Sequence, residues 1–470
     1  MSRLSAVLLI VCCAALCSAQ PQQSTPKDFI KVPAGNIALE HVRVIDGTGS
    51  AAKTDQTIVI SGGKITAIGA AGSVQVPADA NHMDFTGYSA LPGMVGMHDH
   101  LFYPASGGLY HNMPFSFPRL YLANGVTTIR TAGNIEPYVD LEIKRSIDAG
   151  KTVGPKINVT APYLEGAGTF IAQLHQLSGP DDARKTVEYW ADEGARSFKA
   201  YMFITRAELK AAADAAHARG MKITGHLCSI GFREAAELGI DNLEHGLEVD
   251  TEFFAEKKPD VCPNPGQASL AASKLEVTGE EIQTTIRTLV SHHVAVTSTL
   301  PVFEQSVLSR PDVPQKVLDT LSDDASKAYH ANRARLTADS PRVPMFTKEL
   351  QFERAFVKAG GVLLAGLDPT GLGGIVAGYG DQREVELLVE AGFTPVEAIK
   401  IATLNGAQFL GEADHIGSLA VGKQADIVLV KGDPSANIQD IENVELVFKD
   451  GVGWDSKKLI ESVKGQVGVR

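Results

Sequence analysis

Short apolar runs alternate with amphipathic segments through the middle of the chain. Eight of these runs have the length and turn-residue boundaries of buried strands. They lie at 90–97, 125–131, 156–161, 197–202, 222–225, 242–244, 294–300 and 362–367. The segments between them have helical periodicity, and the clearest begins with a capping box formed by Thr205 and Glu208. Eight strand–helix units in a row predict an α/β fold, a closed (β/α)8 TIM barrel, with a doubly wound open sheet as the alternative.

Both ends of the chain are β-rich. β-branched runs separated by glycine-containing turns occupy 36–90 and recur in 412–460. Because matching patterns flank a long middle, we predict one small β-sandwich domain built from both chain termini, and a barrel domain over 91–411. The connection at 301–342 is long for a loop between a strand and a helix. It is either a lid over the site or a peripheral decoration.

The first residues have the pattern of a secretory signal peptide. Arg3 supplies a positive charge, 6–16 is apolar, and the small residues 17–19 end the run. A membrane anchor is the alternative, but the run is short for a hydrocarbon core of about 30 Å. We therefore predict cleavage of 1–19, a polar leader over 20–35, and an exported protein, periplasmic or secreted, that no longer contacts a membrane.

Charge and cysteine content narrow the expected partners. The formal net charge is −12, which makes nucleic acid a poor partner and leaves a small-molecule substrate as the expectation. Three of the five cysteines fall in the predicted signal peptide, and the pairing of the remaining two, Cys228 and Cys262, stays open. We do not expect disulfides to be the main source of stability. Whether the protein is a homo-oligomer also stays open.

The candidate chemistry begins with His98 and His100. Alternate residues on a strand point the same way, so the two imidazoles face one point where the first barrel strand ends. Two imidazoles on one face suit a divalent metal ion. A His-x-His pair alone is nevertheless a weak indication, and further ligands are needed to support a metal site.

Lys199 lies inside the fourth apolar run. Burying a lysine costs free energy unless something pairs with it. The side chain either extends its amine to the surface or reacts with CO2. The resulting carbamate is an anion that can bridge two metal ions and offset their repulsion.

Three more candidate ligands follow later strands: His226 the fifth, His245 the sixth and Asp368 the eighth. Singly, each is an ordinary core histidine or turn residue. Together with the earlier candidates they fall at the carboxyl ends of the predicted strands, which form the catalytic face of a barrel. The joint pattern therefore predicts a metal centre at that face.

The order His-x-His, Lys, His, His, Asp resembles the amidohydrolase superfamily, in its binuclear branch with a carboxylated lysine. Segments at 44–49, 125–128, 398–411 and 416–428 also resemble that family, so the resemblance covers nearly the whole mature chain. Prolidase-like and imidazolonepropionase-like enzymes are the most similar subgroup. Most imidazolonepropionases proper use one metal and lack the lysine, so Lys199 places this chain on the prolidase-like side.

The resemblance implies a role for each candidate. Two divalent metal ions are implied, with zinc the first expectation. The ligands of the more buried ion are His98, His100 and Asp368, and those of the more exposed ion are His226 and His245. Lys199, carboxylated by CO2, and a hydroxide bridge the ions. Asp368 takes the proton of the attacking water and passes it to the leaving amine.

Other candidates have weaker support. Tyr201 lies two residues after Lys199 on the same strand face, where its hydroxyl is a candidate catalytic donor to a developing oxyanion. His111 is either a substrate contact or a solvated loop residue. Arg130 either meets a substrate carboxylate or pairs inside the barrel. The histidines that we interpret as structural are His175, His292 and His293.

These features predict a metal-dependent hydrolase acting on carbon–nitrogen bonds. The implied substrates are dipeptides, such as Xaa-Pro or other Xaa-amino acids, and N-acyl amino acids. The same centre acting on a cyclic amide, a lactone or a phosphotriester is the alternative, because the fold does not choose among them. An inactive barrel that serves as a binding protein is a remote alternative, since all the ligand positions are filled.

Overall fold

The computed structural model describes residues 24–105 and 109–468. The predicted signal peptide, 1–19, lies outside these residues. Within the described ranges, no helix combines the length and the apolar character that a membrane crossing requires.

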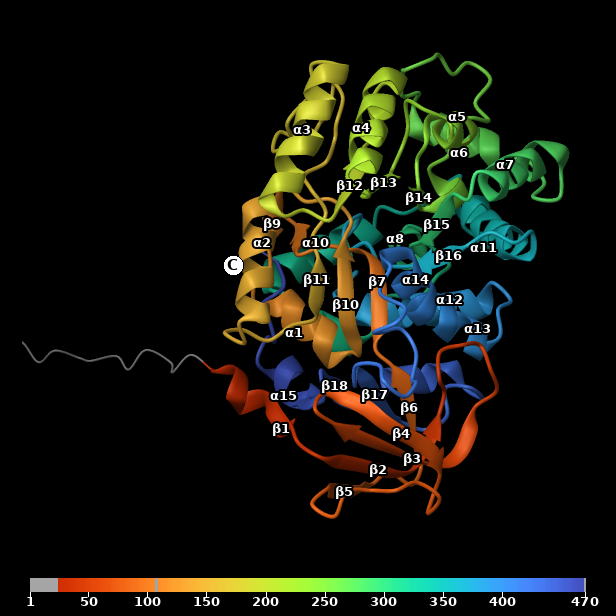
Figure 1. The fold of residues 1–470 in the computed structure, drawn as a ribbon. Coiled ribbons are helices and arrows are strands. Elements are labelled where there is room, and N and C mark those ends of the chain that lie inside the picture. The colour runs from red at the N-terminus through yellow and green to blue at the C-terminus, as the bar shows by residue number, and fades with distance from the viewer. Residues whose placement is uncertain (1–23, 106–108, 469–470) are drawn as a thin grey trace, which may run out of the picture.

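Eight parallel strands in the described residues form the barrel (Figure 1). They are β7 (Met94–Asp99), β10 (Val126–Thr131), β11 (Lys156–Asn158), β12 (Ser197–Ala200), β13 (Lys222–Gly225), β14 (Asn242–Glu244), β15 (Ala295–Ser298) and β16 (Leu363–Ala365). They pair in two groups, in the orders β11-β10-β7 and β12-β13-β14-β15-β16. A parallel bridge between Thr160 and Ser197 joins the groups on one side. On the other side the Asp368 amide donates to the His98 carbonyl at 3.0 Å, so backbone contacts join the groups on both sides.

Helices alternate with these strands along the chain. The main ones are α1 (Ser116–Ala123), α2 (Pro137–Asp148), α3 (Pro180–Glu193), α4 (Arg206–Ala218), α5 (Phe232–Leu238), α7 (Glu280–Ser291), α11 (Arg342–Lys358) and α12 (Tyr379–Glu390). The predicted capping box at the start of α4 is present, with the Glu208 amide donating to the Thr205 hydroxyl. Phe198, Ile223 and Val296 on the strands are fully buried. The alternation of apolar runs and amphipathic segments therefore corresponds to strands and helices that share a core.

The first predicted run divides into two strands that belong to different sheets. β6 (Tyr88–Pro92) pairs antiparallel with β17 (Ile427–Lys431), whereas β7 pairs parallel with β10. Gly93 lies between them, and a Cβ there would come 2.0 Å from the Thr127 hydroxyl oxygen. The chain passes from one sheet to the other at a position that only glycine fits. Hydrophobicity alone does not separate the two strands, because both are buried.

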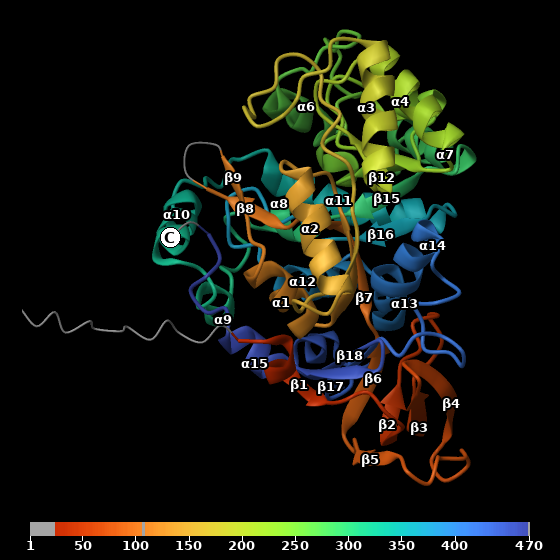
Figure 2. The ribbon, with the colours of Figure 1, turned by 60° about the vertical axis from the view of Figure 1, so that its left-hand side comes forward.

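Strands from both ends of the chain form one nine-stranded sheet within the described residues (Figures 1 and 2). Its order is β1-β19-β18-β17-β6-β2-β3-β4, and β5 pairs with β2. The remaining bounds are β1 (Ile30–Val32), β2 (Ile37–Val44), β3 (Lys53–Ser61), β4 (Lys64–Ala70), β5 (Asn81–Asp84), β18 (Val444–Lys449) and β19 (Val452–Asp455). Leu39, Ile58, Ile427 and Phe448 pack in one buried cluster. The sheet therefore has a core of its own at one end of the barrel.

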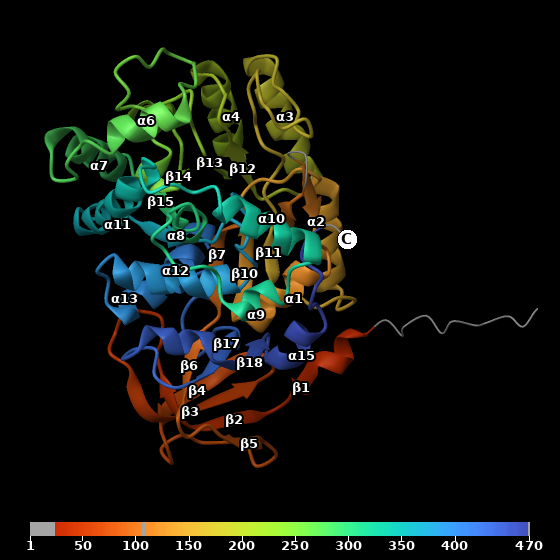
Figure 3. The same cartoon turned by 180° about the vertical axis from the view of Figure 1, so that it is seen from behind.

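The connection at 301–342 is partly helical. It contains α8 (Leu300–Glu304), α9 (Gln315–Leu318) and α10 (Asp323–Arg333), which face the viewer in Figure 3. The buried Tyr329 hydroxyl bonds to Gln305, and Leu321 forms a bridge with Val467 near the C-terminus. The Tyr329–Gln305 bond lies within the connection, and the bridge to Val467 joins it to the end of the chain. Arg310 joins it to Glu390 on the flanking helix α12 (Tyr379–Glu390).

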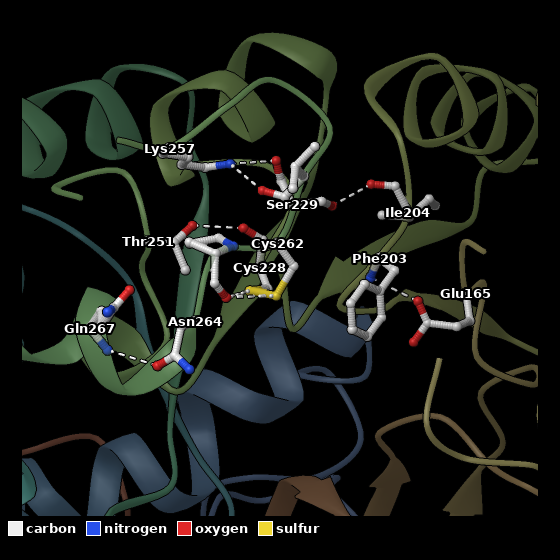
Figure 4. Close-up of a disulfide and its surroundings, with 12 residues drawn as sticks. Glu165, Phe203, Ile204, Cys228, Ser229, Thr251, Lys257, Cys262, Asn264 and Gln267 are labelled. Atoms are coloured by element: carbon white, nitrogen blue, oxygen red, sulfur yellow. Dashed lines mark hydrogen bonds between the residues drawn. A yellow bond between two sulfur atoms is a disulfide. The ribbon is translucent and has the colours of Figure 1, made fainter. Parts of the chain in front are cut away.

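A disulfide joins Cys228 and Cys262 (Figure 4). It connects the segment after β13 to the loop that leads into α6 (Pro265–Ala272). The Thr251 hydroxyl donates to the Cys228 carbonyl beside it. The sequence left open whether these two cysteines pair, and in the structure they do. The disulfide connects the loops that follow the fifth and sixth barrel strands.

Candidate active site

The predicted ligands come together at the carboxyl ends of the barrel strands. They are His98 and His100 at the end of β7, Lys199 on β12, His226 after β13, His245 after β14, and Asp368 three residues after β16. All are buried except His226, which is partly buried. All of them except His245 line one cavity. Because the strands are parallel, their carboxyl ends share one rim, and residues far apart in the sequence meet there.

Three imidazoles point at the carboxylate of Asp368. Nε2 of His98 lies 3.6 Å from Oδ2, Nε2 of His100 lies 3.6 Å from Oδ1, and Nε2 of His245 lies 3.9 Å from Oδ2. These separations exceed hydrogen-bond distances, so the atoms face one another without bonding. Nε2 of His245 and Oδ1 of Asp368 are buried and have no hydrogen-bond partner in the described part of the chain. Burying such atoms costs free energy unless something else binds them.

A divalent metal ion fits this arrangement. One ligand atom each from His98, His245 and Asp368 lies within 4.8 Å of the others. Imidazole nitrogens and carboxylate oxygens are the donors that zinc and similar ions accept. The unpaired atoms of His245 and Asp368 are the ones that such an ion would satisfy. The structure therefore contains a potential metal site made of two histidines and an aspartate.

The other ring nitrogen of each of these three histidines has a fixed partner. Nδ1 of His98 lies 2.8 Å from Oε2 of Glu244, and Nδ1 of His245 lies 2.7 Å from the Thr299 hydroxyl. Nδ1 of His100 lies 3.1 Å from the Gly133 carbonyl. Such contacts at Nδ1 hold the ring and leave Nε2 for a metal ion. The three Nε2 atoms are thus turned toward the centre before any ion binds.

Glu244 connects the histidines to two buried cations. Its Oε1 lies 3.3 Å from Nζ of Lys199 and 3.2 Å from a terminal nitrogen of Arg130. Burial alone raises the pKa of a carboxyl, but Lys199, His98 and Arg130 together hold the pKa of Glu244 well below its usual range. Glu244 is therefore an anion at neutral pH, and it compensates positive charge beneath the site.

Burial also sets the protonation of the nitrogen bases. It lowers the pKa of Lys199 to about 8, although the charge of Glu244 opposes this shift. It lowers the pKa of His226 to about 3, and it lowers the pKa values of His98, His100 and His245. The histidines are therefore neutral at neutral pH, which is the form that binds a metal ion.

Tyr201 lines the same cavity as Lys199 and His226. Its ring centroid lies 5.2 Å from that of His226 and 4.5 Å from that of Tyr163. Burial raises the pKa of Tyr201 well above its ordinary value, so its hydroxyl keeps its proton and can donate a hydrogen bond. The side chain therefore lies where the sequence places it, beside the candidate ligands.

The structure places the weaker candidates either inside the barrel or on the surface of the protein. Arg130 is fully buried and bonds to the Met97 carbonyl, Thr224 and Glu244, so it pairs inside the barrel. His111 is exposed on β9 (Tyr110–Asn112). The three histidines interpreted as structural lie on the surface: His175, His292 and His293.

Glu244 and Tyr163 are the residues that the sequence reasoning missed. Glu244 is a charged residue in a buried strand, directly before His245. A buried charge needs a partner, and this holds for Glu244 as it does for Lys199. Tyr163 carried no comparable signal, because an aromatic residue after an apolar run is ordinary core composition.

The model of the amidohydrolase family matches residues 89–453. The chain belongs to the amidohydrolase family. Curated relatives match this amidohydrolase only locally. Adenine deaminase 2 from Jannaschia sp. (strain CCS1) is 41% identical over 70 residues, 15% of this chain and 11% of the relative. Imidazolonepropionase from Parabacteroides distasonis is 53% identical over 62 residues, 12% of this chain and 15% of the relative, so the chain spans a small part of either protein in these matches.

Solved structures resemble this amidohydrolase over most of its length. A Bifidobacterium longum protein described as a prolidase has a TM-score of 0.67 and 23% identity, covering 92% of this chain and 99% of that one. A Xaa-Pro dipeptidase with bound methionine in its active site has a TM-score of 0.66 and 20% identity, covering 90% and 100%. At these identities the likeness shows a shared fold, and it agrees with the predicted (β/α)8 barrel.

Proposed function

We propose that this amidohydrolase hydrolyses an amide bond of a small molecule with the help of bound divalent metal ions. The observation that carries the proposal is the set of three imidazoles turned toward Asp368, with His245 Nε2 and Asp368 Oδ1 buried and unpaired. Dipeptides, Xaa-Pro among them, and N-acyl amino acids are the first candidate substrates. The prolidase and the Xaa-Pro dipeptidase of similar fold support that choice.

Two ions, zinc first among the candidates, would be shared among all six ligands. One would be held by His98, His100 and Asp368, the other by His226 and His245, with carboxylated Lys199 reaching both. When bound, such ions lower the pKa of a water and polarise the scissile carbonyl. The proximity of the His226 and His245 rings, with centroids 4.5 Å apart, supports the second position.

Asp368 moves the proton in this proposal. Its Oδ1 is buried, has no hydrogen-bond partner among the described residues, and lines the cavity. The carboxylate accepts a proton from the attacking water, whose oxygen forms the new bond to the carbonyl carbon. It then passes that proton to the leaving nitrogen as the C–N bond breaks, so the products are an acid and an amine.

Tyr201 and Glu244 complete the arrangement. The Tyr201 hydroxyl donates a hydrogen bond to the carbonyl oxygen as negative charge develops on it. Glu244 holds the ring of His98 by accepting from Nδ1, and it balances the charge of Arg130. Glu244 therefore acts through other residues and does not touch the substrate.

Lys199 is the residue that we propose to be carboxylated. Its neutral amine attacks the carbon of CO2, an N–C bond forms as one C–O π bond opens, and the nitrogen releases a proton to water to give a carbamate. The nitrogen keeps one hydrogen, which can still donate to Oε1 of Glu244, 3.3 Å away. The Lys199 side chain is only 1% exposed, so its amine is enclosed beside Glu244. A lysine on the protein surface would have no fixed partner of this kind.

Metal analysis of the purified protein tests this assignment most directly. We expect about two equivalents of metal per chain. Lys199→Ala should lose bound metal and activity, and a short carboxylic acid such as propionate should restore part of both. Lys185→Ala, which changes a lysine that is 65% exposed on α3, is the matched control and should retain both. One equivalent or none in the wild type, or full activity of Lys199→Ala, contradicts the binuclear assignment.

A substrate panel tests the bond that is cleaved. The panel contains dipeptides, N-acyl amino acids, lactones and phosphotriesters, each assayed by product release with the metal-loaded enzyme. We expect amides to be cleaved, and we expect Asp368→Asn to lower kcat by at least about 100-fold, because proton transfer is lost. Cleavage of lactones or phosphotriesters alone would contradict the proposal.

We also propose that the protein is exported. The charged, apolar and small-residue pattern of 1–19 supports this, as does the disulfide, since disulfides persist mainly in oxidising compartments. Expression of the full chain, followed by N-terminal sequencing of the protein recovered outside the cytoplasm, should give a start near residue 20. An intact N-terminus in the cytoplasmic fraction would be the contrary result.

A further inference from the structure

Aromatic side chains form one wall of the cavity beside the candidate metal ligands. Phe102 comes from β8 (Phe102–Pro104), Tyr110 from β9, Tyr163 from the segment after β11, and Tyr201 from the end of β12. The ring centroids of Phe102 and Tyr110 lie 5.1 Å apart, and those of Tyr163 and Tyr201 lie 4.5 Å apart. Ile135 and Ile171 add apolar surface to the same cavity. We call the four aromatic residues the aromatic wall.

The ring of Tyr163 is held in place from behind. A Cβ on Gly133 would come 2.6 Å from a carbon of this ring, so the ring packs directly on the glycine backbone. The carbonyl of the same glycine contacts Nδ1 of His100 at 3.1 Å. Gly133 therefore contacts both a candidate metal ligand and Tyr163, so the Tyr163 ring is preorganised relative to the reacting centre.

The three tyrosine hydroxyl groups of the aromatic wall have no hydrogen-bond partner within residues 24–105 and 109–468. Among the residues that the structure describes, the hydroxyls of Tyr110, Tyr163 and Tyr201 make no hydrogen bond, and Tyr163 is only 7% exposed. None of these hydroxyl oxygens is among the fully buried unpaired atoms, so they reach the open space of the cavity. A bound molecule with carbonyl oxygens can therefore accept hydrogen bonds from them while its apolar part lies against the rings.

The size of the cavity limits that molecule. The cavity volume is about 60 Å³, well below the roughly 300–1,000 Å³ of most ligand sites. Such a space holds only the part of a substrate that lies next to the scissile bond, so the aromatic wall contacts the group closest to that bond.

We propose that the aromatic wall selects amides that carry an aromatic group next to the scissile bond, and that Tyr163 determines this specificity. The inference rests on the proposed amide hydrolysis and narrows its substrates. Aromatic rings prefer tilted and offset contacts with other rings, and they gain from such contacts beyond the burial of apolar area. A substrate with a small aliphatic group next to the scissile bond would make few contacts with the aromatic wall and would leave its rings exposed to water.

Two probes that differ only in one ring test the selection: N-acetyl-L-phenylalaninamide and N-acetyl-L-alaninamide. Calorimetry with the metal-loaded enzyme gives the Kd of each, and product release gives kcat/KM. We expect the phenylalanine probe to bind at least about tenfold more tightly, because the ring is buried against the wall. Equal Kd values for the two probes in the wild type would overturn the inference without recourse to any variant.

Variants at Tyr163 test the residue itself. Tyr163→Leu keeps an apolar side chain but removes the aromatic face, and it should reduce the ratio of the two Kd values to within about threefold. Tyr163→Phe removes only the hydroxyl and should keep most of the ratio. Tyr189→Ala, at a tyrosine on α3 that is 51% exposed, is the matched control and should leave the ratio unchanged. If Tyr163→Leu kept the wild-type ratio of the two Kd values, Tyr163 would not determine the specificity for aromatic groups.

The two readouts separate the inference from the proposed function. If both probes are hydrolysed with equal kcat/KM and bind equally, the selection is wrong while amide hydrolysis stands. If neither probe nor any amide of the panel is hydrolysed, but the phenylalanine probe binds more tightly in a Tyr163-dependent way, amide hydrolysis is wrong while the aromatic wall stands.

Discussion

Buried carboxyl groups occur in two regions of this protein, and they are in opposite states. Glu244 lies beneath the candidate metal site on β14. Glu349 and Glu353 on α11 and Glu384 on α12 lie on the flank of the barrel. All four are at most 1% exposed, so burial by itself does not distinguish the two regions.

Their neighbours distinguish them. Burial raises the pKa of every one of these groups, but at Glu244 the cations Lys199 and Arg130, together with the contact from His98, reverse the effect. On the flank, burial raises the pKa of Glu353 to about 8, and burial together with the charge of Glu353 raises the pKa of Glu384 well above its ordinary value. Both carboxylate oxygens of Glu353 are without a hydrogen-bond partner among the described residues. The comparison teaches that a buried carboxylate indicates a functional centre when cations surround it, and a protonated structural group when they do not.

The largest expected effect is that of Glu244→Gln. This change leaves Arg130 buried without its anion, and in the uncarboxylated protein Lys199 as well, which should cost about 3–5 kcal/mol of unfolding free energy. It should also weaken metal binding by about 10–100-fold, because the partner of His98 Nδ1 changes. Urea unfolding and metal titration measure the two effects.

The matched control for this variant is Glu237→Gln on α5, which changes an exposed carboxylate. It should alter neither quantity. Glu244→Gln with wild-type stability and wild-type metal affinity would show that the cations do not depend on Glu244, and the contrast between the two regions would fail.

Glu353→Gln should raise the free energy of unfolding at pH 8, whereas Glu244→Gln should lower it. The pKa of Glu353 is raised in the folded state from 4.5 to about 8, so its contribution to stability is present below about pH 4.5 and is lost as the pH rises toward 8. The neutral amide does not titrate, so at pH 8 the variant should be more stable than the wild type by about 1–3 kcal/mol, and the difference should shrink toward pH 5. Urea unfolding at several pH values measures this. A variant that is less stable than the wild type at pH 8 would mean that Glu353 is ionised and favourably paired in the folded protein.

The smallest expected effect is that of Thr299→Val. It removes the hydroxyl that lies 2.7 Å from Nδ1 of His245 and keeps the shape of the side chain. Metal affinity should fall by about tenfold, because the ring loses one restraint, while the fold is retained. Thr278→Val, at an exposed threonine, is the control. Equal metal affinity in both variants would show that packing alone orients His245.

Much of the fold follows from patterns that are local in the sequence. Each of the eight apolar runs contains at least part of a barrel strand, and the Thr205 capping box is present. The boundaries were less well predicted. The run at 294–300 continues past β15 into α8, because Thr299 and Leu300 are apolar or β-branched but no longer pair with a neighbouring strand.

The candidate site was predictable because its residues are of unusual type for their positions. His98, Lys199 and Asp368 follow or interrupt apolar runs, and parallel strands bring such positions to one rim. Which residue supports which was not predictable. The pairing of Glu244 with three different strands depends on how the sheet curves, and no spacing within the sequence encodes that distance.

The sequence by itself determined the alternation of strands and helices and the order of the candidate ligands, because side-chain periodicity and residue type are local properties. The tertiary structure alone decided that Cys228 pairs with Cys262, that Glu244 and Gly133 turn two imidazoles toward Asp368, and that Tyr163 stands against the cavity. These contacts join segments separated by tens of residues, and only the packing of the whole barrel brings such segments within a few ångströms.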